Sequence, residues 1–115
     1  MTNREAIASE IEPYSLSDEA YETAFVKSVA HFGIIADIES NYDADMIMPV
    51  AYAGMICLAK LLTLNSENIG GVSQSYDPSK LTAAIKSLAA SAGLSASLVL
   101  DDVSDNYGIG AVKVW

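Results

Sequence analysis

The side chains best suited to chemistry in this 115-residue chain are three aspartates near one end, a single histidine and a single cysteine. Asp101, Asp102 and Asp105 place three carboxylates close together, and such oxygen ligands can hold Mg²⁺ or Ca²⁺. The spacing lacks the longer alternation and the terminal glutamate of an EF-hand loop. It therefore favours a solvated loop, and we expect no metal and no cofactor.

The remaining reactive residue types have structural interpretations. His31 lies near the end of a predicted helix, where an imidazolium interacts well with the helix dipole. Cys57 lies among apolar residues, which favours a buried thiol that behaves as a small hydrophobic group. The glycines Gly70-Gly71 and Gly108-x-Gly110 lack the context of a phosphate-binding loop. With no recognisable catalytic set, the sequence predicts that the protein is not an enzyme.

Composition narrows the class of protein further. Hydrophobic residues make up 51% of the chain, which argues against disorder, and the length suits a single domain over residues 1–115. The net charge of -9 argues against binding to a nucleic acid backbone or to anionic lipid. Residues 1–45 hold ten acidic and two basic side chains, a net charge of -8. This acidic third suits either a solvated face or a surface that repels passing DNA, and charge leaves both open.

Four helices are predicted from caps and apolar periodicity. The first begins with a capping box formed by Thr2 and Glu5 and ends before Pro13. The second begins near Ser17 and ends at Gly33. The third covers roughly residues 44–63 and starts near Asp45, so that Pro49 falls in its first turn; the fourth starts at Asp77-Pro78 and ends at Gly93.

Two segments between these helices need separate interpretation. Residues 34–45 show no clear period and are predicted to be a connection with one helical turn around Ile35 and Ile38. Met46–Leu64 is long and apolar enough to span a membrane, at about 28 Å as a helix. Pro49, Gly54 and Lys60 favour instead a central helix covered by neighbouring helices or by other subunits. We therefore expect no membrane association.

Two or three short strands complete the predicted fold. Val72, Gln74 and Tyr76 alternate with serines, which is typical of a strand, and Tyr107–Trp115 forms a second apolar strand. The fold class is therefore mainly α, a four-helix domain with short strands after the third helix and at the C-terminus. An apolar strand that ends in a tryptophan is expected to dock either on its own domain or on a neighbouring subunit.

This layout resembles the small head–tail connector, or head-completion adaptor, proteins of tailed bacteriophages and prophages. The resemblance covers most of the chain in layout and residues 60–94 in specific motifs. The residues that carry it are Leu61-Leu62, Ser66 to Gly71, Val72-Ser73-Gln74-Ser75-Tyr76, Asp77, Leu81 and Gly93-Leu94.

The resemblance implies a structural role and no catalytic residues. Such connectors form homo-oligomeric rings between the portal protein and neck or tail proteins, and DNA passes through the lumen without specific binding. The implied location is the virion neck, or the host cytoplasm during assembly. The best interface candidates are then Val72, Tyr76, Val112, Val114 and Trp115. The alternative is a helical protein-interaction module or regulator of a bacterial host with no virion role.

Overall fold

The computed structural model describes residues 1–67 and 77–104, and this part of the chain is mainly helical, as predicted. Its helices in chain order are α1 (Asn3–Glu10), α2 (Asp18–Phe32), the short 3₁₀ helix η1 (Ala44–Met46), α3 (Ile47–Glu67), α4 (Pro78–Ala92) and α5 (Ser97–Ser104). The described part holds one isolated antiparallel bridge, between Thr2 and Asn41, and no strand. The strands predicted at 72–76 and 107–115 lie outside the described residues.

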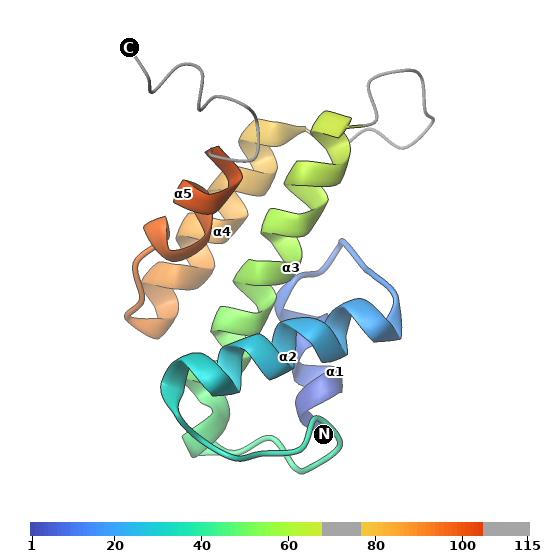
Figure 1. The fold of residues 1–115 in the computed structure, drawn as a ribbon, viewed down its shortest axis with the longest axis vertical. Coiled ribbons are helices and arrows are strands. Elements are labelled where there is room, and N and C mark those ends of the chain that lie inside the picture. Colours follow the sequence, from blue (N-terminus) through green and yellow to red (C-terminus); the bar gives the residue numbers. More distant parts are fainter. Residues whose placement is uncertain (68–76, 105–115) are drawn as a thin grey trace.

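Helix α3 forms the centre of the fold. It contacts every other helix, with α1 and α2 against its first half and α4 and α5 along its other half (Figure 1). Val50, Ala51, Leu58 and Leu61 on its inner side are buried in the core, whereas Met48 on the opposite side is exposed. The segment Ala44–Leu64 is long and apolar enough to cross a membrane, yet most of it is buried against the rest of this fold. The prediction of a central helix is confirmed, and neighbouring helices cover most of it, whereas Ile47, Met48 and Leu64 are exposed.

Local capping chemistry places the ends of the first two helices and of α4 where the sequence predicts them. The Thr2 hydroxyl accepts a hydrogen bond from the Glu5 amide, and the Glu5 carboxylate accepts one from the Thr2 amide. Ser17 caps α2, and Asp77 caps α4 ahead of a proline at its first position. Both α2 and α4 end at a glycine in the left-handed conformation, at Gly33 and Gly93.

The third helix begins as predicted but ends later. Pro49 is its third residue, within the first turn, where a missing amide costs nothing. Its C-terminal end lies at Glu67, so the prediction that the helical period breaks at Asn65 is wrong. The residues of the extra turn are mostly polar, so apolar periodicity does not predict it. The turn forms because it continues a helix that tertiary packing already stabilises.

A fifth helix corrects the predicted four-helix domain. The sequence predicts no helix after Gly93, but residues 97–104 form α5. An eight-residue helix is marginal in isolation. Here Val99 is buried in the core, and α5 packs against α3. This packing provides a stabilisation that short-range sequence signals do not reveal.

Candidate functional site

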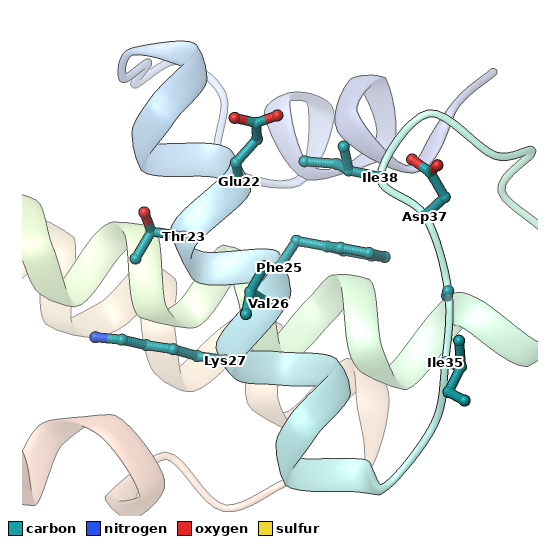
Figure 2. Close-up of a pocket in the computed structure, with 9 residues that line it drawn as sticks. Glu22, Thr23, Phe25, Val26, Lys27, Ile35, Asp37 and Ile38 are labelled. Atoms are coloured by element: carbon teal, nitrogen blue, oxygen red, sulfur yellow. The ribbon is translucent and has the colours of Figure 1, made fainter.

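The clearest concave surface in the described part of the chain is a groove between α2 and the connection that follows it. We call it the α2 groove; its volume is about 850 Å³. The residues that line it are Glu22, Thr23, Phe25, Val26, Lys27, Ile35, Ala36, Asp37 and Ile38. Figure 2 shows Phe25 pointing from α2 toward the connection that carries Ile35 and Asp37. The groove is mainly apolar, with acidic side chains at one end and a lysine near the other.

The turn at Gly33 creates this groove. Gly33 has φ of 68°, a conformation that L side chains rarely adopt, and the amide of Ile34 donates to the Val29 carbonyl. The chain then returns beside α2 in an extended path. Phe25 and Ile38 are buried at the base of the groove, whereas Val26 and Ile35 are exposed at its rim.

The structure corrects the prediction for this connection. A helical turn was expected around Ile35 and Ile38. Residues 34–37 have no regular structure, but Ile38 and Glu39 form a turn that the Ser40 amide closes by donating to the Asp37 carbonyl at 3.0 Å, and a 3₁₀ turn follows at Ala44–Met46. The Ile35 side chain is fully exposed rather than packed. Main-chain hydrogen bonds to the start of the chain hold Ile38, Ser40 and Tyr42, and they fix the path of the connection from this turn onward.

The start of α1 fastens the connection. The amide of Asn3 donates to the Ser40 carbonyl and that of Arg4 to the Ile38 carbonyl, both at 2.9 Å. The Tyr42 amide donates to the Met1 carbonyl at 2.8 Å. The Asn3 side chain is fully buried, and its Nδ2 donates to the Asp37 carbonyl at 2.9 Å. The wall of the groove is therefore tied to the N-terminal helix by main-chain and side-chain hydrogen bonds.

Replacing Asn3 by alanine should loosen the connection. The substitution removes the bond to the Asp37 carbonyl, and losing one buried hydrogen bond costs about 1–2 kcal/mol. Amide hydrogen exchange should accelerate at residues 38–42, with little change in α4. Asn3→Asp is the informative companion, because Oδ1 has no hydrogen-bond partner among the described residues and a carboxylate there would be buried without a donor. Equal exchange in all three proteins would contradict this role.

An ionic cluster on the surface joins α1, α2 and the connection. Arg4 lies 2.6 Å from a Glu39 carboxylate oxygen, 3.2 Å from Glu22 and 3.6 Å from Asp18. The hydrogen bonds that Arg4 donates to the carboxylate of Glu39, and the one that it donates to Glu22, raise the pKa of the Arg4 guanidinium. Sequence reasoning did not identify this cluster. The available signal was that Arg4 is one of two basic residues in the acidic first third of the chain.

A second, smaller groove of about 360 Å³ lies between α2, α3 and α5. Tyr52, Ile56 and Leu98 form apolar parts of its wall, and Lys27 and Lys60 stand on its sides. Lys27 also lines the α2 groove, so the two grooves adjoin along α2.

Large exposed apolar side chains gather at one end of the molecule. Among the described residues they are Met1, Val26, Ile34, Ile35, Ile47, Met48 and Leu64. All except Leu64 come from the N-terminus, α2, the connection and the start of α3, which occupy the lower half of Figure 1. We call this set without Leu64 the apolar end. The α2 groove forms part of it.

The residue types that could act in catalysis are not assembled in the described part of the chain. His31 is in the last turn of α2, as predicted, with its ring 4.7 Å from that of Tyr52 and 4.9 Å from that of Phe32. No group of three or more His, Cys, Asp or Glu side chains within residues 1–67 and 77–104 could hold a metal ion. The sequence predicts a solvated loop at Asp101, Asp102 and Asp105, but Asp101 and Asp102 belong to α5, so the loop is wrong for these two residues; Asp105 lies outside the described residues.

Cys57 is buried, as the sequence predicts, and should resist thiol reagents. Burial raises the pKa of its thiol to about 12, and the ammonium of Lys60 opposes this shift only in part. The thiolate is the reactive form, and its fraction in the folded protein is very small at pH 8. Labelling with a disulfide reagent at pH 8 should therefore be slow in buffer and complete in denaturant. Rapid labelling of the folded protein would contradict this.

The five interface residues predicted from the sequence, Val72, Tyr76, Val112, Val114 and Trp115, all lie outside the described residues. Their role remains a prediction. The described residues contribute a different surface, the apolar end, which sequence reasoning did not identify.

The fold and its surface define a small helical protein with an exposed apolar end and no assembled catalytic set in its described part. The chain belongs to the family of unknown function DUF6706, whose sequence profile matches residues 1–107. No curated protein and no solved structure matches it.

Proposed function

We propose that this protein is a structural component of a tailed-phage or prophage virion, a ring-forming connector between the portal and the tail components. The observation that carries the proposal is the apolar end. Its six side chains are exposed in the single chain although the protein has an ordinary buried core. Several large exposed apolar side chains on elements at one end of a fold are a feature of protein–protein contact sites. A homo-oligomer supplies the cover that one copy lacks.

The acidic side chains are consistent with such a role. All ten carboxylates among residues 1–45 are exposed, so none is buried in the core. Arg4 neutralises part of one cluster, and the remainder gives the N-terminal region a strong negative potential. A ring with this region toward its lumen would let DNA pass, because phosphate would be repelled rather than bound.

Several helical features behind the connector resemblance are present. The long central helix includes Leu61-Leu62 and the next helix begins at Asp77-Pro78 and ends at Gly93. The residues between them, which carry much of the specific motif, are outside the described part. The resemblance therefore supports the proposal through the helical layout.

The proposal is tested in the strain that carries the gene. Tailed particles induced from it should contain this protein by mass spectrometry, in a fixed ratio to the portal protein. Deleting the gene should yield filled heads without attached tails. Particles that lack the protein and stay infective after the deletion would exclude the connector role and favour the host interaction module.

A further inference from the structure

We infer that the α2 groove of one copy receives residues 107–115 of the next copy, so that the ring closes through a head-to-tail contact. This inference rests on the proposed function and names the surface that accepts the chain end. The groove has an apolar base of Phe25 and Ile38 and an exposed apolar rim of Val26 and Ile35. A segment that binds in this groove must therefore be apolar and narrow.

The occupant is indicated by the sequence of the segment that follows α5. Residues 107–115 read YGIGAVKVW, with five large apolar or aromatic side chains and one charged residue, Lys113. Asp37 borders the groove beside Glu22, which is ion-paired with Arg4, and the Asp37 carboxylate matches the single positive charge of the segment. Aromatic anchors in apolar pockets with a complementary charge at the edge are typical of stable contacts.

The geometry favours a neighbour's groove over the chain's own. Helix α5 ends beside the C-terminal end of α3, whereas the connection that forms the groove lies at the opposite end (Figure 1). The eleven residues after Ser104 reach at most about 40 Å when fully extended. To reach the α2 groove of its own copy, the segment would have to run back along α3. The molecule is 42 Å in its longest dimension, so this path would use much of the length of the segment. A neighbouring copy can offer its groove without this detour.

The contact joins two different surfaces of identical chains. Such a heterologous contact generates a closed ring when its rotation closes, which is what a connector requires. It also explains why the apolar end is exposed in the single chain.

Trp115 provides a direct probe, because it is the only tryptophan in the chain. Trace wild-type protein is mixed with a large excess of a Trp115→Phe copy, which contributes no tryptophan emission. The excess copy should shift the Trp115 emission to shorter wavelength by burying the ring in its groove. A second excess copy carries Trp115→Phe together with Ile35→Glu; its apparent affinity should be weaker by about tenfold or more, because a charge replaces an apolar contact.

The controls separate binding from folding. Ile35 is fully exposed, so the glutamate should leave the thermal unfolding midpoint unchanged. Leu64→Glu in the excess copy is the matched control, because Leu64 is exposed at the other end of α3. That copy should shift the emission as strongly as Trp115→Phe alone.

The inference is overturned if no excess copy shifts the emission, or if the Ile35→Glu copy shifts it equally. An emission that is already blue-shifted in dilute wild-type protein would assign the segment to its own chain and also overturn it. Its failure is distinguishable from that of the proposed function. If virions contain the protein but the Trp115 emission does not shift, the connector role is retained and only the groove contact fails. If the emission shifts but no virion contains the protein, the result supports self-assembly in another setting.

Discussion

Replacing Gly54 by leucine is expected to destabilise the protein by about 2–3 kcal/mol, because three helices meet at this residue. A Cβ at Gly54 would lie 3.0 Å from Leu88 Cδ2, 3.4 Å from Ile11 Cγ2 and 3.6 Å from Glu10 Cβ. The rest of a leucine side chain would have to displace α4 or α1. The loss should appear as a lower urea midpoint in circular dichroism, with an unchanged helical signal in buffer.

Two matched variants make this prediction selective. Gly54→Ala adds only the Cβ, whose nearest neighbour is the mobile end of Leu88, and a gain in helix propensity of about 1 kcal/mol offsets the crowding. Its stability should stay close to wild type. Ala83→Leu places a leucine at an exposed position of α4 and should change the free energy of unfolding by less than about 0.5 kcal/mol. An unchanged midpoint for Gly54→Leu would contradict the close approach of α1, α3 and α4.

Truncating Leu81 to alanine should cost about 2–5 kcal/mol, since the side chain is fully buried where α4 begins to pack on α3. Domains of this size are stable by about 5–15 kcal/mol, so the variant should be close to unfolded at elevated temperature. Thermal unfolding followed by circular dichroism measures the effect.

The neighbouring residue supplies the control for Leu81. Thr82 is half-buried in the same turn, and Thr82→Ala should shift the midpoint by far less. If the two substitutions had similar effects, α4 would not pack on α3 through the face that Leu81 and Ile85 define.

The success of the sequence predictions follows from how local their causes are. The capping box at Thr2, the Ser17 and Asp77 caps and the left-handed glycines depend on groups within a few residues of one another. In α2, Tyr21 and Phe25 lie one turn apart in a buried apolar stripe, and such spacing likewise depends on helical periodicity alone.

The failures arise where a distant segment decides the outcome. α5 depends on Val99 entering a core built mostly by α3, and the connection depends on Asn3 and Arg4, more than thirty residues earlier in the chain. In both cases the local sequence is ambiguous, so long-range contacts choose among conformations of similar local free energy.

The α2 groove was beyond prediction for the same reason. Its base joins Phe25, part of a recognised apolar stripe, to Ile38 in a segment without a period. Whether Ile35 was packed or exposed depended on the path that α1 imposes on residues 38–42.

The amino-acid order alone was therefore sufficient for the helical class, the starts of α1, α2 and α4, the buried thiol at Cys57 and the acidic N-terminal third. These properties reflect periodicity, capping and charge. Periodicity and capping depend on residues close together in the sequence, and net charge depends only on the number of acidic and basic residues. The apolar end and the groove required the folded molecule, because a surface forms only when packing has chosen which apolar side chains are left outside the core.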